Sequence, residues 1–311
     1  MNIRVYQPGD EVAQVAIFNT AAASLPGFKP ATVEEQLRRI RAPGFKPESR
    51  MYATEGNEIK GYITFQDQGR ISFPWTLPGQ ESLREPLLNA LLEQVKSQGI
   101  SRLFTAYRGD WSSVLEFFQQ HGFRQSREMV NFVQKLTELP TMVTRRGVSP
   151  TALKREEIPL LVAMVPNLFR LSGVELEKYL LSNPLFSNES TIVLRKADGS
   201  PQAVGLFILD EQYADPTKLD PLAPCFRLGA FGTEGMSTKR INGMFSFCAA
   251  PTRDAHPLGL DLLWCAIQRL DESYLDSLAA QVPSDVPHLL SFYEKYFRRQ
   301  ASFPIFEREV G

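Results

Sequence analysis

The residue of this chain best suited to chemistry is Tyr293, in the stretch Ser284 to Arg298 near the C-terminus. A phenol can donate a proton to a leaving group, so a tyrosine can act as a general acid. Leu289, Phe292, Tyr293 and Tyr296 also recur at i, i+3, i+4 and i+7, which is one apolar face of a helix. On that pattern alone a core role is the simpler interpretation of Tyr293, and the acid role needs a second signal.

The second signal is an earlier copy of the same pattern. Two motifs recur 175 residues apart and a third 144 apart: Leu87-Leu88 before Leu262-Leu263, Phe117-Phe118 before Phe292-Tyr293, and Gly61-Tyr-Ile-Thr-Phe before Gly205-Leu-Phe-Ile-Leu. Two unrelated domains would not keep one separation over two distant motifs, so the sequence predicts an internal duplication. The difference, 175 − 144 = 31, predicts an insertion of about that size between Asp210 and Ile241.

Hydrophobic periodicity predicts the same order of elements in both halves. In the first half we expect strands at 2–6, 49–54, 59–65, 70–75, 103–106 and 129–136, and helices at 12–23, 31–41, 82–98 and 111–121. In the second half we expect strands at 148–153, 191–196, 202–210, 243–249 and 275–282, and helices at 157–171, 174–181, 258–270 and 284–298. A polar join marked by Pro and Gly near 138–147 predicts domains 1–140 and 141–311, the second with the insertion at 211–241.

This order of elements resembles the GCN5-related N-acetyltransferase (GNAT) superfamily, and two local motifs carry the resemblance. One is a strand, loop and helix, Trp75-Thr-Leu-Pro-Gly-Gln-Glu-Ser-Leu-Arg84 and its match Cys248-Ala-Ala-Pro-Thr-Arg-Asp-Ala-His-Pro-Leu-Gly259. The other is an aromatic run, Phe117-Phe-Gln-Gln-His-Gly-Phe123 and Phe292-Tyr-Glu-Lys-Tyr-Phe297. The resemblance covers nearly the whole chain. It implies an α/β (α+β) fold of two tandem GNAT-like domains, each a mixed, mostly antiparallel sheet flanked by helices, an arrangement similar to that of mycothiol synthase.

The resemblance also implies an acetyl-CoA site at the loop before the helix, where main-chain N–H groups and the positive helix end bind pyrophosphate. In the second half Arg253 suits a phosphate and Gly259 suits close backbone approach, although Pro257 lacks an N–H. The cofactor-binding residues implied there are Phe247, Cys248, Ala249, Arg253, Asp254, Ala255, His256, Pro257, Leu258 and Gly259. In many such enzymes a tyrosine at the aromatic run protonates the departing CoA thiolate, which implies a catalytic role for Tyr293.

The loop of the first half departs further from the family pattern. Its candidate cofactor residues are Leu77, Gly79, Gln80, Ser82, Leu83 and Arg84. Ser82-Leu-Arg-Glu85 fits a capping box, whose side chains would occupy the amides that a phosphate needs, and Glu85 adds a negative charge. Phe118 cannot donate a proton. We therefore expect a degenerate first domain and an acyl-CoA site in the second.

The expected reaction is direct attack of an unidentified amine on the thioester of acetyl-CoA, in a cleft between strands 243–249 and 275–282. Asp210, Glu211 and Glu234 are candidate bases, although a solvated loop charge is the simpler interpretation of each. Cys248 lies in no Cys–His–acid spacing, so a buried small side chain is simpler there than a nucleophile.

Other functions remain open, because the eroded loops also suit a non-catalytic tandem module that senses CoA or holds a partner. Aminoacyl transfer from tRNA by a Fem-like tandem protein fits poorly, since the formal net charge of −1 and a pI near 6.4 argue against nucleic acid and anionic membranes. Three scattered cysteines and three isolated histidines favour a reducing compartment and no metal site. With a polar N-terminus and no long apolar run, we expect a cytoplasmic monomer or homodimer whose partner is a small-molecule or peptide amine.

Overall fold

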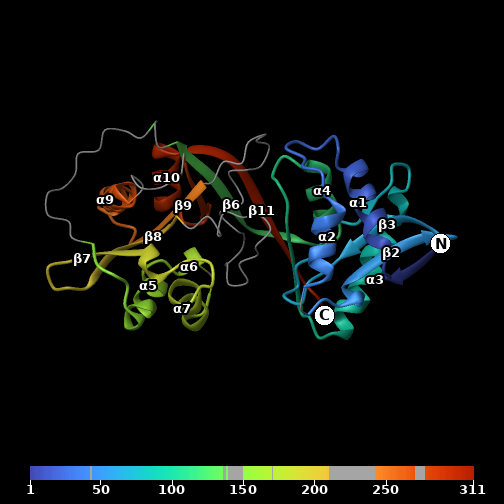
Figure 1. Cartoon of the computed structure of the whole chain (residues 1–311), viewed down its shortest axis with the longest axis horizontal. Helices are drawn as coiled ribbons and strands as arrows, with labels where there is room; N and C mark the ends of the chain where they lie inside the picture. Colours follow the sequence, from blue (N-terminus) through green and yellow to red (C-terminus); the bar gives the residue numbers. More distant parts are fainter. Residues whose placement is uncertain (43, 136–137, 139–149, 170, 210–241, 270–276) are drawn as a thin grey trace. The chain divides into compact units, whose positions relative to one another are not determined.

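The helices and strands of the chain group into two compact units (Figure 1). The computed structural model describes residues 1–42, 44–135, 138, 150–169, 171–209, 242–269 and 277–311. They divide into unit 1, Met1–Ser126 with Phe303–Gly311, and unit 2, Arg127–Ser302. The predicted boundary at 140/141 lies outside the described residues. The two compact units divide at 126/127 and 302/303.

Unit 1 consists of an antiparallel sheet with helices packed on it. Its strands are β1 (Asn2–Val5), β2 (Arg50–Glu55), β3 (Glu58–Thr64), β4 (Trp75–Thr76) and β5 (Arg102–Ala106), and its helices are α1 (Asp10–Ala21), α2 (Val33–Ile40), α3 (Arg84–Ser97) and α4 (Ser112–Gln120). The first four strands form one sheet in the order β1-β2-β3-β4. Helix α2 begins at a capping box, in which the Thr32 hydroxyl accepts from the Glu35 N–H and the Glu35 carboxylate accepts from the Thr32 N–H. That box was predicted from the sequence.

Unit 2 contains a mixed sheet covered on both faces. Its strands are β6 (Arg124–Lys135), β7 (Thr191–Arg195), β8 (Pro201–Ile208), β9 (Asn242–Ala249) and β10 (Ser277–Pro283), and its helices are α5 (Ile158–Met164), α6 (Pro166–Phe169), α7 (Gly173–Leu181), α9 (Ala255–Gln268) and α10 (Pro287–Tyr296). The strand order is β6-β10-β9-β8-β7, antiparallel except between β9 and β10. Helices α5 and α7 cover one face, and α9 covers the other (Figure 1). The predicted fold class is confirmed.

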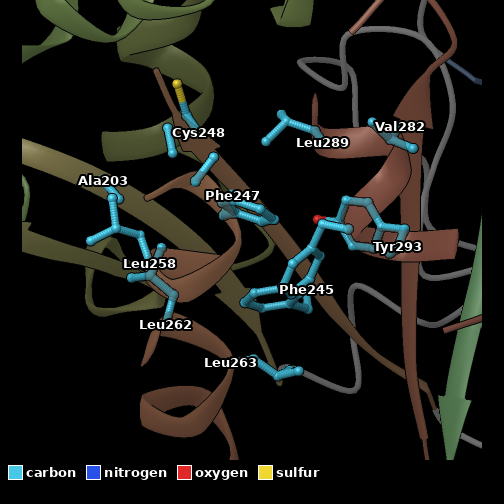
Figure 2. Packing of buried hydrophobic residues seen from close by; sticks show 14 of the residues in the cluster. Ala203, Phe245, Phe247, Cys248, Leu258, Leu262, Leu263, Val282, Leu289 and Tyr293 are labelled. Atoms are coloured by element: carbon cyan, nitrogen blue, oxygen red, sulfur yellow. The ribbon is translucent and has the colours of Figure 1, made fainter. Parts of the chain in front are cut away.

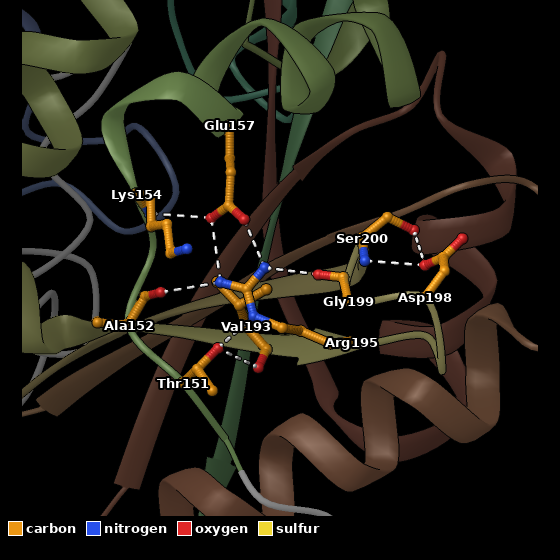
Figure 3. A network of polar contacts seen from close by, with 9 residues as sticks. All are labelled: Thr151, Ala152, Lys154, Glu157, Val193, Arg195, Asp198, Gly199 and Ser200. Atoms are coloured by element: carbon orange, nitrogen blue, oxygen red, sulfur yellow. Dashed lines mark hydrogen bonds and ion pairs between the residues drawn. The ribbon is translucent and has the colours of Figure 1, made fainter.

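The hairpin β7–β8 is tied to the chain before α5 by one arginine (Figure 3). The Arg195 guanidinium pairs with both carboxylate oxygens of Glu157 and donates to the Gly199 carbonyl at 3.1 Å. Its Nε donates to the Thr151 hydroxyl at 2.7 Å. The hydrogen bond from Arg195 holds the pKa of Glu157 below its usual value. Because Arg195 already has these partners, we interpret this network as structural.

The last strand of the first sequence half pairs within unit 2, and the last strand of the second half pairs within unit 1. Residues 129–135 of β6 pair with β10, and residues 305–309 of β11 (Arg298–Glu309) pair with β5. Phe306 of β11 is buried in the core of unit 1. The sequence prediction kept the strand at 129–136 in the first domain and placed no strand after residue 298. Strand alternation specifies a buried face but not the neighbouring strand, so this exchange could not be predicted from it.

The duplication recurs in the packing between strand and helix. A Cβ on Gly61 would lie 3.2 Å from Leu87 Cδ1, and a Cβ on Gly205 would lie 3.1 Å from Leu262 Cδ2. Gly61 faces Thr76 across β3 and β4, and Gly205 faces Phe247 across β8 and β9. Thr76 and Phe247 are 171 residues apart. The second half therefore has 27 extra residues between Gly205 and Phe247 and four more between Phe247 and Leu262. The sequence analysis had placed all 31 within 210–241.

Candidate active site

Strands β9 and β10 separate part-way along their length. Among the described residues they pair at three positions, of which the last joins Met244 to Ala279. Beyond it β9 stays paired with β8 as far as Ala249, and β10 stays paired with β6 as far as Pro283. The facing edges of β9 and β10 therefore have backbone N–H and C=O groups that the other strand does not satisfy. This split lies between the two strands predicted to form the cleft.

Tyr293 lies on α10 beside the split and is 1% exposed. Its ring stacks on Phe132 at 5.7 Å and packs edge-on to Phe297 at 5.1 Å between centroids. Its hydroxyl points toward Phe247 and has no hydrogen-bond partner among the described residues (Figure 2). Burial raises the pKa of Tyr293 far above its usual value, and the Phe247 backbone and the Ser246 side chain act in the opposite direction. The phenol therefore keeps its proton at ordinary pH.

Two further groups lie at the end of β9. The Nε2–H group of His288, on α10, donates a hydrogen bond to the Ala249 carbonyl oxygen at 2.9 Å. The Cys248 thiol is buried, donates to the Leu161 carbonyl at 3.8 Å, and has a pKa raised to about 12 by burial. A thiol so hard to ionise is a poor nucleophile. His288 was missed because nothing in the sequence links it to Ala249, 39 residues earlier.

The predicted second-half loop is partly exposed and partly core. Arg253 and Asp254 are exposed, whereas Phe247, Cys248, Ala249, Ala255, Leu258 and Gly259 are buried, and His256 and Pro257 are half-buried. Helix α9 begins at Ala255 with no side-chain cap, but the Ala255 N–H donates to the Thr252 carbonyl at 3.1 Å and the Leu258 N–H to the Asp254 carbonyl at 2.9 Å. Because Pro257 has no N–H, the first-turn amide left without an acceptor among the described residues is that of His256. A Cβ on Gly259 would lie 2.7 Å from the Phe247 ring and 2.8 Å from the Phe292 ring. Packing against these rings therefore requires glycine there, whether or not a cofactor approaches.

The first-half loop differs from its prediction. Helix α3 begins at Arg84 with Leu83 as its N-cap and no side-chain cap, so the capping box predicted for Ser82 and Glu85 is wrong. A short 3₁₀ turn at Glu81–Leu83 comes before the helix, and the Glu81 carboxylate accepts from the Gly79 N–H at 3.1 Å. Leu77 and Leu83 pack against the core of unit 1, and Gln80 lies between the exposed Gly79 and Glu81.

Buried polar atoms without partners lie at both ends of this loop. They are Thr76 Oγ1 at the end of β4 and Arg84 Nε at the start of α3. The Arg84 guanidinium lies 5.2 Å from the centroid of the Phe73 ring. These atoms keep the first-half loop a candidate ligand site.

A side chain bridges the strands of the first half where they separate. The Ile71 N–H donates to the Phe104 carbonyl at 2.9 Å, but the Phe73 N–H donates to the Tyr107 hydroxyl at 2.6 Å. The Tyr107 ring also stacks on Trp111 at 5.7 Å. The residue 175 positions after Tyr107 is Val282, which has no hydroxyl. Tyr107 thus occupies a backbone donor at the strand separation of the first half. The sequence analysis missed this residue.

The candidate bases Asp210, Glu211 and Glu234 lie outside the described residues, as does the insertion. Within the described ranges no group of three or more His, Cys, Asp or Glu side chains could hold a metal ion. No helix in the part of the chain that the structure describes is long and apolar enough to cross a membrane.

The similarity of this chain to known proteins lies in the fold. No family model and no curated protein matches the sequence. A GCN5-related N-acetyltransferase from Sphaerobacter thermophilus matches 99% of this chain and 95% of its own, with 14% identity and a TM-score of 0.65. The chain has the GNAT fold. A GNAT-family acetyltransferase from Colwellia psychrerythraea matches all of both chains, with 10% identity and a TM-score of 0.51. A Salmonella typhimurium protein solved with its cofactor acetyl-CoA matches 42% of this chain and 83% of its own, with 17% identity and a TM-score of 0.35. The two full-length matches agree with two GNAT-like domains in one chain.

Proposed function

We propose that this protein is an acyl-CoA-dependent N-acyltransferase that uses acetyl-CoA and has its active site at the split between β9 and β10. One observation carries the proposal. The Tyr293 hydroxyl is buried without a partner beside the strand edges that do not pair. An unsatisfied buried hydroxyl is costly, and such groups in native structures call for a functional explanation. A thiolate leaving group would supply the missing partner.

In this mechanism acetyl-CoA supplies a thioester whose C–S bond breaks as the amine nitrogen bonds to the carbonyl carbon. Tyr293 donates its proton to the departing sulfur and becomes a phenolate. The phenolate regains a proton from the nitrogen, directly or through water, so the phenol is restored and no acyl-enzyme forms. Its raised pKa keeps the phenol protonated before reaction and makes the phenolate a strong base afterwards.

The residues present fit acetyl-CoA at this place. Backbone groups of Phe247 to Ala249 would hold the pantetheine arm, although the Ala249 carbonyl is already bonded to His288. The His256 N–H in the first turn of α9 and the exposed Arg253 would meet the pyrophosphate. The acceptor would be a small-molecule or peptide amine. We propose a cytoplasmic protein, monomeric or homodimeric.

Thiol release from acetyl-CoA in the presence of an amine panel tests this function, with the acetylated amine identified by mass spectrometry. Arg253→Gln should weaken acetyl-CoA binding about tenfold, because one charged hydrogen bond is lost. Arg298→Gln is the matched control, since Arg298 is also exposed and carries the same charge. Equal weakening in both variants would remove the phosphate role of Arg253.

A second function is favoured by two polar contacts, one near the strand separation of each half. Tyr107 occupies the Phe73 N–H in the first half, and His288 occupies the Ala249 carbonyl in the second. A non-catalytic module that senses CoA or holds a partner would keep both contacts. Such a module would either bind CoA or fail to bind it. In both cases it would consume no thioester, whatever amine is offered.

A further inference from the structure

Two polar side chains lie just beyond the last pair of β9 and β10, one on each edge of the split. They are Ser246 on β9 and Gln281 on β10, each two residues past the pair of Met244 and Ala279. Side chains alternate between the two faces of a strand, so both point to the face of Met244 and Ala279. Met244 belongs to the core that α5 and α7 cover. Ser246 and Gln281 therefore line the split on the α5 face.

Accessible space opens at Ser246. Within residues 243–249 of β9, an interior strand of the sheet, Ser246 is the one residue that is not buried. Its neighbours Phe245 and Phe247 point to the other face, where the Tyr293 ring packs on them at 6.3 and 5.9 Å between centroids. The Tyr293 hydroxyl points toward Phe247 (Figure 2). The proton donor and the opening thus lie at the same level of the split, on opposite faces.

A buried pair of amides holds Gln281 in place. Asn131 of β6 lies directly opposite Gln281 in the antiparallel pairing of β6 with β10, so its side chain is on the same face. The Gln281 amide nitrogen donates to the Asn131 side-chain oxygen at 2.8 Å. Gln281 is 7% exposed and Asn131 is 3% exposed. Because the nitrogen of Gln281 is already bonded to Asn131, its oxygen is the end of the amide that can meet a ligand.

The Gln281 side-chain oxygen is an unused acceptor. It accepts no hydrogen bond from any residue that the structure describes, and it is not among the buried polar atoms sealed from solvent. The oxygen therefore borders accessible space, and Ser246 opens such space at the facing position of β9. An acceptor that a second amide fixes in a nearly buried place suits an N–H or O–H group of a ligand.

The matching place in unit 1 is apolar. The residue 175 positions before Gln281 is Ala106. Ala106 pairs with Ile305 across β5 and β11, as Gln281 pairs with Asn131 across β10 and β6. The fold therefore forms without polar side chains at these two positions. Burying two amides costs free energy that apolar side chains would not, so a role in binding explains the pair in unit 2.

We propose that Gln281 binds the attacking amine, with its side-chain oxygen accepting an amine N–H and Asn131 holding that oxygen in position. This role rests on the proposed acyl transfer at the same split. A neutral amide accepts a hydrogen bond but takes up no proton at ordinary pH. The proton that the nitrogen loses therefore still passes to the Tyr293 phenolate, directly or through water, and Gln281 only orients the nitrogen.

The same side chains set the class of amine. Ser246, Gln281 and Asn131 carry no charge, and an ammonium ion placed against uncharged groups in a nearly buried site loses much of its hydration. The nitrogen also needs a free lone pair to attack the thioester. The acceptor is therefore a weakly basic amine bound in its neutral form. An α-amine with a pKa of about 8 fits this description better than an alkylamine with a pKa of about 10.4.

Steady-state kinetics of the full chain at pH 8 test this role, with alanine amide as the weakly basic amine and n-butylamine as the strongly basic one. We expect kcat/KM to be about tenfold or more higher for alanine amide, because a far larger fraction of it is neutral. Gln281→Met keeps the length of the side chain and removes the amide. It should raise the KM for alanine amide about three- to tenfold, because one neutral hydrogen bond is lost, and leave the KM for acetyl-CoA unchanged.

Two further variants separate binding from packing. Gln134→Met is the matched control, since Gln134 is also a buried glutamine of unit 2 but lies opposite Leu278, on the other face of the sheet. It should leave both KM values unchanged. Gln281→Glu keeps an acceptor oxygen and adds a charge that attracts an ammonium ion, so it should shift the preference toward n-butylamine. This variant decides the role of Gln281 even where Gln281→Met fails to fold.

The outcomes distinguish this role from the function on which it rests. If no amine stimulates thiol release by the wild type, the acyl transfer itself fails, and the role of Gln281 fails with it. Acyl transfer that is slowed equally by Gln281→Met and Gln134→Met, or an amine preference that Gln281→Glu does not change, overturns the role and leaves the acyl transfer standing. A wild type that prefers n-butylamine overturns the class of amine.

Discussion

Replacing Tyr293 by Phe should separate activity from stability. The substitution keeps the ring contacts with Phe132, Phe245 and Phe297 and removes only a hydroxyl that has no described partner. A buried unsatisfied polar group costs about 1–3 kcal/mol. We therefore expect the free energy of unfolding to stay unchanged or to rise by up to about that amount.

The same substitution should slow thioester turnover by about 10- to 10⁴-fold, because a positioned general acid contributes a factor of that size. This equals about 1.4–5.4 kcal/mol in the activation free energy. Urea denaturation measures the first effect, and release of the CoA thiol measures the second. Full activity in the variant would exclude Tyr293 as the acid.

Tyr52→Phe is the matched control for stability. It also removes one buried tyrosine hydroxyl, but this one donates to Gln14 at 2.6 Å. Loss of that bond should lower the free energy of unfolding by about 0.5–1.5 kcal/mol. If Tyr293→Phe were destabilised as much as Tyr52→Phe, the Tyr293 hydroxyl would have a partner, and the reasoning from its isolation would fail.

Three further predictions concern the fold. Phe306→Ala should lower the free energy of unfolding by about 3–5 kcal/mol, as β11 completes the core of unit 1, whereas the exposed Glu309→Ala should change it by less than about 0.5 kcal/mol in urea melts. Gly259→Val should cost about 1–3 kcal/mol through collision with two aromatic rings, and an unchanged melt would show that this helix can shift. Burial raises the pKa of Tyr62 and Tyr293, so the folded chain keeps protons that the unfolded chain loses near pH 10. Stability should therefore be full below about pH 10 and fall above it, and a flat profile from pH 8 to pH 11 would contradict the burial of these hydroxyls.

The repeated motifs were readable because each serves a packing need that recurs. Gly61 and Gly205 each admit a leucine of the following helix, and that need preserves both residue types at a fixed separation. The aromatic pairs Phe117-Phe118 and Phe292-Tyr293 likewise pack α4 and α10 against their hydrophobic cores. The predicted helices and most of the predicted strands follow from that periodicity. The capping box predicted at Ser82 failed because a short 3₁₀ turn took up those residues before α3 began.

The sequence by itself determined the duplication, the GNAT-like order of elements, and the position of Tyr293 in the second aromatic run. These depend on local spacing, which a chain displays without folding. Only the tertiary structure decided which strands pair, so β6 was assigned to the first domain and β11 was not predicted at all. Only it showed that Tyr107 bridges the first separation and that the Tyr293 hydroxyl is left without a partner beside the second. Hydrogen bonds between residues far apart in sequence depend on three-dimensional placement, and residue spacing carries no record of it.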